Sequence, residues 1–205
     1  MNREELTLAT LGNNNRIPTW DNPRITHELE VKSLSLDFGE PEGSVFFRQK
    51  IDELRSGLTP GLVEVADLLL KGYQSARIAK IRKTEQMTAK KQIKSIYIHH
   101  DINRHEQLLA LVTTEFVDSH INSFLKSMNT NELSPTELQV LKSILKGKNN
   151  EIISKELFTT VIGIKDQVGI LLKKIKLKSK VEVLTSFIEF LKNIETQVSD
   201  IPNNM

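Results

Sequence analysis

Apolar residues along most of this chain recur at steps of three and four, the spacing of helices that bury one face. Over 164–175 the expected buried stripe is Ile164, Val168, Leu171 and Ile175, at steps of four, three and four. Similar stripes cover 60–71 and 135–146, and one continues for more than six turns over 104–128. The pattern predicts an all-α protein, although alternation over Leu29–Phe38 is compatible with one short strand.

The same pattern occurs twice. "LTPGLVEVADLLLKG" (58–72) and "LSPTELQVLKSILKG" (133–147) lie 75 residues apart, and the same offset pairs 58–112 with 133–187 without a gap. Twelve of the 55 pairs are identical, where ordinary residue frequencies would give roughly three or four. Each copy also opens with a helix cap before proline (Thr59, Ser134) and stops its first helix with glycine (Gly72, Gly147). The sequence therefore predicts a duplicated small domain.

The expected organisation follows from this repeat. We predict two tandem four-helix units joined by a long helix that spans about 104–128. The boundaries are an irregular N-terminal segment that ends in a helix (1–57), a first domain (58–112), a helical connector (113–132), a second domain (133–196) and a frayed tail (197–205).

Composition narrows the function. The 205 residues include 28 Lys and Arg against 26 Asp and Glu, so basic character must be local if it is used. There is no cysteine, hence no thiolate metal site. No apolar run approaches membrane-spanning length, and the acidic, polar N-terminus is unlike a signal peptide, so a cytoplasmic protein is expected. We find no enzyme, cofactor or metal-binding motif, and His99, His100 and His105 lack ligand spacing.

A capped helix, a short helix, a tight turn and a longer helix together make a helix-turn-helix pattern, whose second helix enters the DNA major groove. Residues 133–187 resemble the LuxR/GerE-type DNA-binding domain along their whole length. The matching elements are Leu133-Ser134-Pro135 with Glu137, Gly147, Asn150, Ile153-Ser154, Leu157, the segment Ile164-Lys165-Asp166-Gln167-Val168, and Leu177. Residues 58–112 resemble it through Leu58-Thr59-Pro60, Gly72, Ile78-Ala79 and the segment Thr88-Ala89-Lys90-Lys91-Gln92-Ile93.

Both copies depart from the family pattern. The second copy has Gly163 where the family has a threonine that commonly meets a phosphate, and both copies have glutamine where the family often has histidine. The first copy has Arg82 and His100 where buried apolar residues are usual.

By this resemblance, DNA would be contacted from the exposed face of the longer helix of each copy. The expected DNA-binding residues are Gln86, Thr88, Lys90, Lys91, Lys94 and Ser95 in the first copy and Lys165, Gln167, Lys173 and Lys174 in the second. Lysines can neutralise phosphates, while Gln86 or Lys91 could reach a base edge. The alternative for the first copy is an ordinary solvated helix face.

The second copy is less clearly a DNA reader. Its Val161, Ile162 and Ile170 are suited to a protein partner, and Asp166 would repel phosphate. A degenerate structural copy is a third interpretation. The basic run from Lys173 to Lys180 could follow the DNA backbone, or it could be a solvated helix end favoured by the helix dipole.

The resemblance implies a DNA-binding transcriptional regulator, bacterial and not an enzyme. Most proteins with this domain carry one copy and dimerise, whereas two copies in one chain could hold an extended, asymmetric site as a monomer. The segment before the first copy is too short for the receiver or acyl-homoserine-lactone domains that commonly precede this module. The other hypothesis is an interaction protein whose repeats bind RNA polymerase or another regulator, and a second copy of the chain is a further candidate partner.

Overall fold

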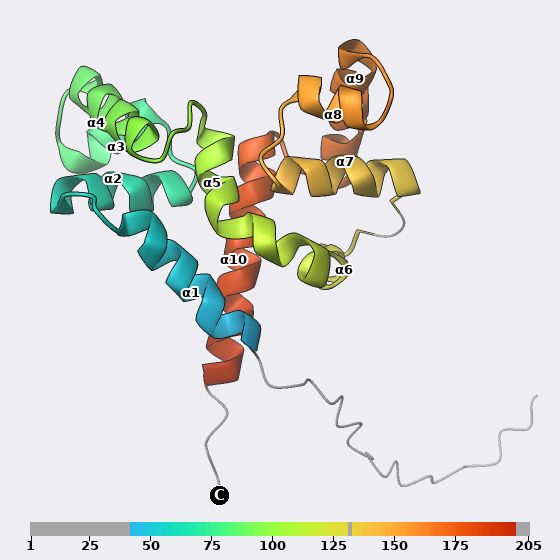
Figure 1. Ribbon diagram of the computed structural model, residues 1–205, viewed down its shortest axis with the longest axis horizontal. Helices are drawn as coiled ribbons and strands as arrows, with labels where there is room; N and C mark the ends of the chain where they lie inside the picture. The colour runs from blue at the N-terminus through green and yellow to red at the C-terminus, as the bar shows by residue number, and fades with distance from the viewer. Residues whose placement is uncertain (1–41, 131–132, 200–205) are drawn as a thin grey trace, which may run out of the picture. The chain divides into compact units, whose positions relative to one another are not determined.

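The computed structural model describes residues 42–130 and 133–199, which belong to one compact unit (Figure 1). Side chains are described for 47–130 and 133–196. These residues contain helices and no strand, so the expected all-α class holds for them. The strand considered at 29–38, the rest of the N-terminal segment before 42, and most of the tail lie outside the described residues.

Ten α-helices and one 3₁₀ turn follow one another along the described chain. They are α1 (Glu42–Arg55), α2 (Pro60–Leu70), α3 (Ser75–Arg82), α4 (Gln86–His99), α5 (His105–Thr113), η1 (Thr114–Phe116), α6 (Val117–Ser127), α7 (Pro135–Leu145), α8 (Asn150–Glu156), α9 (Val161–Lys174) and α10 (Lys180–Ser199).

Helix starts recur at the offset found in the sequence. The helices α7, α8, α9 and α10 begin 75 residues after α2, α3, α4 and α5. Left-handed backbone conformations recur as well, at Gly72 and Gly147 (φ 78° and 68°) and at Lys83 and Phe158 (φ 52° and 50°). We call α2–α5 the first helix set and α7–α10 the second helix set. The chain therefore turns at matching positions after the first and the second helix of each set.

The buried positions recur in the same way. Four pairs of side chains at the 75-residue offset are completely buried: Val65 and Val140, Ile78 and Ile153, Ala89 and Ile164, and Ile96 and Leu171. All eight belong to one continuous hydrophobic core, which α1 joins through Phe47 and Leu54. The two helix sets thus share a core.

The helix α5 packs against α10, and α1 packs against both of them. In Figure 1 the helices α2–α4 and α7–α9 lie on either side of α5 and the upper part of α10. The ring of Phe47 on α1 meets that of Phe116 edge to face, with centroids 5.5 Å apart.

The prediction of one long helix over 104–128 is wrong. The chain forms α5, then the 3₁₀ turn η1, then α6. Two threonines stand at the break: the Thr114 hydroxyl donates to the Ala110 carbonyl at 2.7 Å, and the buried Thr113 hydroxyl donates to the Leu145 carbonyl at 2.8 Å. Hydroxyls that bond back to the preceding turn bend helices, and the bond to Leu145 ties the bend to the last residue of α7.

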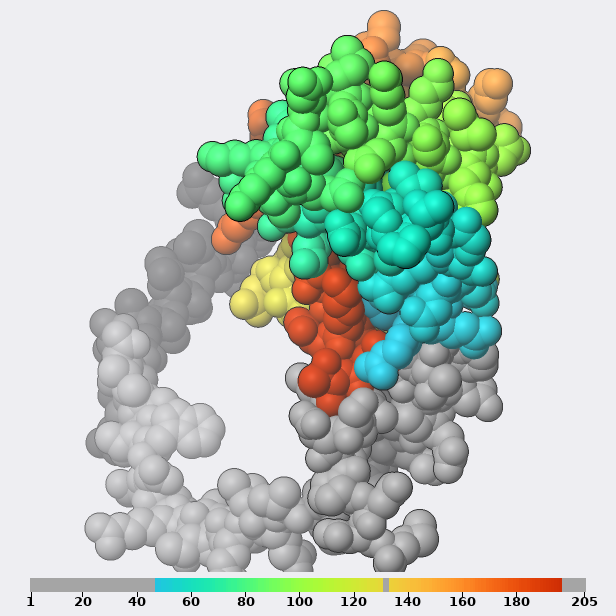
Figure 2. Space-filling view, turned by 90° about the vertical axis from the view of Figure 1, so that its left-hand side faces the viewer, coloured from blue at the N-terminus to red at the C-terminus, as the bar shows by residue number. Residues whose placement is uncertain are grey.

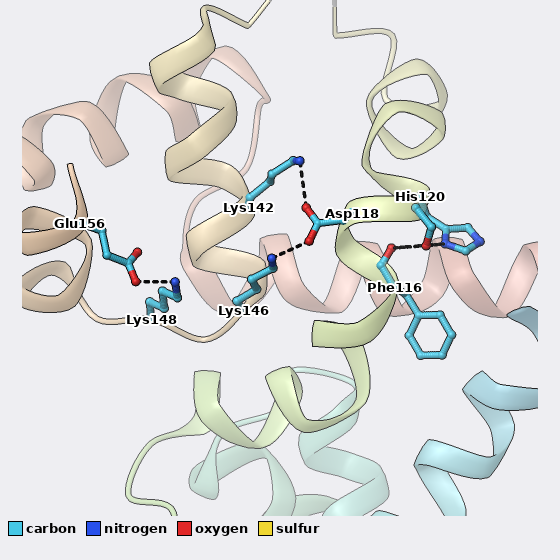
Figure 3. Close-up of polar contacts among 8 residues, drawn as sticks. Phe116, Asp118, His120, Lys142, Lys146, Lys148 and Glu156 are labelled. Atoms are coloured by element: carbon cyan, nitrogen blue, oxygen red, sulfur yellow. Dashed lines mark hydrogen bonds and ion pairs between the residues drawn. The ribbon is translucent and has the colours of Figure 1, made fainter.

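Ion pairs also join α6 to α7. Asp118 on α6 accepts from Lys142 Nζ at 2.9 Å and from Lys146 Nζ at 2.6 Å (Figure 3). These two lysines hold the pKa of the Asp118 carboxyl down at about 2. The last residue of α5 and the start of α6 are therefore both fastened to the end of α7.

Replacing Thr113 with valine should lower the free energy of unfolding by about 1–2 kcal/mol, because a buried hydrogen bond to Leu145 is removed while side-chain volume is kept. Urea denaturation followed by circular dichroism would measure it. The matched control is Thr114→Val at an exposed residue, whose hydroxyl bonds only to the preceding turn and whose change should stay below about 0.5 kcal/mol. Equal effects of the two variants would contradict a special role for the Thr113 bond.

Candidate nucleic-acid interface

Two helix–turn–helix arrangements are present, α3–α4 and α8–α9. In the first turn the Thr84 amide donates to the Ala79 carbonyl at 3.0 Å, and in the second the Thr159 amide donates to the Ser154 carbonyl at 2.9 Å. Each bond closes over a left-handed residue, Lys83 or Phe158. The following helices, α4 and α9, are each 14 residues long and carry no acidic residue in their first turn.

The helix α4 has a buried and an exposed face. Ala89 and Ile96 are fully buried and anchor it to α2 and α3. All six residues predicted for DNA contact on this helix are exposed: Gln86, Thr88, Lys90, Lys91, Lys94 and Ser95. Figure 2 shows the green residues of α3 and α4 at the surface of the protein. These six side chains are therefore open to solvent, and their contact with DNA stays a prediction.

This surface is basic. None of Lys90, Lys91 and Lys94 forms an ion pair with another residue of the described chain. Exposed cationic side chains on and after α3 add to it: Arg77, Lys80 and Lys83. A cluster of unpaired cations around an exposed helix can neutralise phosphates of a DNA backbone.

The unusual Arg82 is satisfied within the fold. Its guanidinium donates to Gln92 Oε1 at 2.6 Å and pairs with Glu64 at 3.2 Å, which links α3 to α4 and α2. The half-buried His100 has a buried Nε2 atom with no hydrogen-bond partner in the described part of the chain, and burial together with His99 lowers its pKa. Both departures from the family pattern are thus accommodated within the fold, away from the exposed face of α4.

The helix α9 presents a different surface. Lys165, Asp166 and Lys173 are exposed, and Ile162 and Ile170 are 71% and 59% exposed. Val161 is only half-buried. Of the three residues predicted for a partner, Ile162 and Ile170 are exposed and Val161 is partly exposed.

Two of the α9 residues predicted to bind DNA interact with other parts of the fold: Lys174 forms an ion pair, and Gln167 is half-buried. Lys174 Nζ pairs with Glu137 at 2.9 Å, and Glu137 also accepts from the Ser134 amide in the capping box of α7. Lys174 and this backbone bond hold the pKa of Glu137 below its usual value. Gln167 is half-buried, and its buried side-chain oxygen has no hydrogen-bond partner among residues 42–130 and 133–199. Lys174 and Gln167 are therefore less available for contact with DNA than the exposed Lys165 and Lys173.

At Gly163, where the family has threonine, the helix supplies another hydroxyl. The Thr160 side chain caps α9 by accepting from the Gly163 amide at 3.0 Å. A Cβ at Gly163 would lie 3.2 Å from Thr159 Oγ1 and 3.3 Å from Thr160 Oγ1, so the neighbours would have to move for a side chain.

Sequence reasoning missed Phe158. It is 97% exposed in the turn between α8 and α9, and Ile152 on α8 is 43% exposed. The sequence feature that could have revealed it is its position, because Phe158 corresponds at the 75-residue offset to Lys83, which is exposed in the first turn. At these two positions the second set carries apolar residues where the first carries the cations Lys83 and Arg77.

Sequence reasoning also missed a basic hollow of about 400 Å³ between the start of α5 and the starts of α8 and α9. Its lining includes Arg104, Lys148, Lys165 and Lys180 together with Glu106 and Glu151. Burial and, less strongly, Arg104 lower the pKa of Lys180, which donates to Asn150, while Glu106 opposes that shift. Lys165 thus has cationic neighbours from both helix sets.

Two of the histidines considered for a metal site lie within hydrogen-bond distance of backbone carbonyls. His99 Nε2 lies 3.1 Å from the Ser56 carbonyl, and Nε2 of the half-buried His105 lies 2.8 Å from the Leu69 carbonyl. Burial lowers the pKa of His105. Over 42–130 and 133–199 no group of three or more potential ligands is placed to hold a metal ion. Within the same residues no helix has the length and apolarity needed to cross a bilayer.

Residues 131–187 match the family described as "Bacterial regulatory proteins, luxR family" (GerE). The match covers α7, α8, α9 and the first part of α10, and these residues form one helix-turn-helix domain of that family. It does not extend to residues 58–112. No curated protein and no solved structure matches the chain.

Proposed function

We propose that the chain is a sequence-specific DNA-binding transcription regulator, and that 58–112 is a second domain of the type found at 131–187. A luxR-family domain indicates DNA binding and regulation for the matched residues. The proposal for the first set rests on helix starts, left-handed turns and buried positions that recur at one offset of 75 residues. By the same family likeness we expect a cytoplasmic bacterial protein that is not an enzyme.

The observation that carries DNA binding for the first set is the exposed, unpaired cationic face of α4. Its lysines would bind phosphates and fix the position of the helix on the duplex. Gln86 at the first residue of α4 and Lys91 five residues later have side chains that can donate to base edges in the major groove. Thr88 offers a hydroxyl to phosphates or bases on the same surface, whereas the Ser95 hydroxyl donates to the Lys91 carbonyl at 3.1 Å.

The helix α9 would contribute differently. Valine and isoleucine can contact a thymine methyl group, but they make no bidentate hydrogen bonds to bases. Lys165 and Lys173 remain free to bind phosphates. We propose that α4 supplies most sequence specificity and that α9 supplies mainly affinity for the DNA backbone.

A second function is favoured by one observation. Phe158, Ile162, Ile170 and Ile152 are exposed apolar residues on α8, α9 and the turn between them. Exposed apolar residues gathered in one region often mark protein interfaces. In this alternative the second set binds RNA polymerase or another regulator, and DNA is bound by the first set or not at all.

The first test replaces Lys90, Lys91 and Lys94 with alanine in the full chain. Binding to random duplex DNA should weaken for all sequences, and the slope of log K against log salt should fall by up to about 2.7, because each phosphate that a lysine no longer neutralises removes about 0.9 from it. Fluorescence anisotropy over a salt series would measure it.

The matched control is Lys71→Ala, Lys126→Ala and Lys192→Ala, which removes the same charge from the end of α2, from α6 and from α10. Its salt slope should equal that of the unmodified protein. An unchanged slope in the α4 variant would rule out the proposed docking of α4.

The second test reverses charge on each helix separately, with Lys91→Glu and Lys94→Glu on α4 and with Lys165→Glu and Lys173→Glu on α9. The α4 variant should lose preference for a duplex selected from a random pool, by roughly 5- to 150-fold for each base pair no longer read. The α9 variant should bind selected and random duplexes more weakly by the same factor.

Equal loss of preference in both variants would mean that the two helices read DNA equivalently. Loss of preference only in the α9 variant would reverse the assignment. If the α9 variant binds all DNA as the unmodified protein does, α9 makes no DNA contact and the protein-binding alternative gains support.

A further inference from the structure

The contacts between the two helix sets are reciprocal. A Cβ at Gly72, after α2, would lie 3.0 Å from Thr185 and 3.6 Å from Val181, both on α10. A Cβ at Gly147, after α7, would lie 2.6 Å from the Ala110 Cβ and 3.1 Å from the Glu106 carbonyl, both on α5.

The residues in the first contact correspond to those in the second at the 75-residue offset, with the two helix sets in exchanged roles. Gly72 and Gly147 are 75 residues apart, as are Glu106 and Val181, and Ala110 and Thr185. The end of the first helix in each set therefore rests on the fourth helix of the other set, at the same two positions of that helix. The absence of a side chain at each glycine permits this close approach, and each glycine also has positive φ.

Such reciprocity defines the relation between the sets. When one patch contacts another and the same two patches also meet with their roles exchanged, the two bodies are related by a two-fold axis. Repeats stacked head to tail would bring one patch of the first set against a different patch of the second, without the exchange.

The helices α5 and α10 pack against each other, and we call this contact the seam. Apolar residues of both helices are buried. Leu108, Leu109 and Val112 on α5 pair by offset with Val183, Leu184 and Phe187 on α10, and each of the six is at most 1% exposed. The symmetry is local, because Thr113, which bonds to Leu145, has Ile188 as its counterpart and Ile188 has no hydroxyl. The apolar seam is thus already filled within one chain.

We propose that a single chain is the complete DNA-reading unit, a dimer-like pair within one polypeptide that binds two half-sites in inverted orientation. This inference rests on the proposed function. Two-fold related helix-turn-helix units read half-sites in inverted orientation, about 10 base pairs apart between centres. Because the exposed faces of α4 and α9 differ, the two halves of the site differ in base sequence.

The test uses the full chain and synthetic duplexes. A site is first selected from a random pool, and its halves are identified by substitution. Three duplexes are then compared. The first carries the two half-sites in inverted orientation, the second carries them as a direct repeat, and in the third one half-site is replaced by a scrambled sequence. Binding is measured by anisotropy, and the mass of the free protein and of the complex is measured by light scattering.

The expected result is a monomeric free chain and one chain per duplex. The inverted arrangement should bind more tightly than the direct repeat by the smaller base preference that α9 contributes, because a chain docked through α4 places α9 on the second half only in the inverted orientation. The direct repeat should bind no better than the duplex with one scrambled half.

Three results would overturn the inference while leaving DNA binding intact: two chains on each duplex, a dimeric free chain, or equal affinity for inverted and direct arrangements. If no sequence is enriched and no duplex shows salt-dependent binding, the proposed function fails, and the inverted half-sites fail with it.

Discussion

The packing of α5 against α10 is the contact on which the rest of this structure depends. Both helices bury apolar residues completely at their shared seam, and both lie within one continuous core. Burial of a leucine, valine or phenylalanine side chain contributes roughly 1.5–3 kcal/mol relative to exposure. Neither set of about 55 residues is large enough to bury a generous core of its own, so the seam supplies stability that each would lack alone.

The seam also determines where the exposed surfaces lie. The helices α4 and α9 stand outside it, each held by buried residues on one face and open to solvent on the other. Their exposed residues differ, whereas their helix starts and buried positions correspond at the 75-residue offset. Lys83, Lys91 and Lys94 of the first set stand where the second has Phe158, Asp166 and Gly169. The helix α4 therefore has a cationic exposed surface and α9 a partly apolar one, although the two helices start at corresponding positions.

Much of the helical framework could be predicted from sequence, because helix caps, glycine stops and apolar stripes are local signals. Thr59-Pro60 and Ser134-Pro135 marked helix starts, and the stripe from Ile164 to Ile175 is buried as expected. The break between α5 and α6 could not be predicted, since the Thr113 hydroxyl meets a carbonyl that lies 32 residues further along the chain. The pairing of Lys174 with Glu137 is likewise a tertiary contact that helix periodicity does not reveal. The reciprocal contacts of Gly72 and Gly147 were equally hidden, because the repeat in the sequence gives the offset but not the orientation of the two copies.

The central claim is that α4 and α9 contact one DNA site together as parts of a single chain. Hydroxyl-radical footprinting on a selected duplex measures this most directly, because it maps backbone protection at single nucleotides. The account predicts two protected segments on one face of the duplex, about one helical turn apart. The Lys165→Glu and Lys173→Glu variant should lose only one of them. A single short protected segment, identical in this variant and in the unmodified protein, would contradict the account.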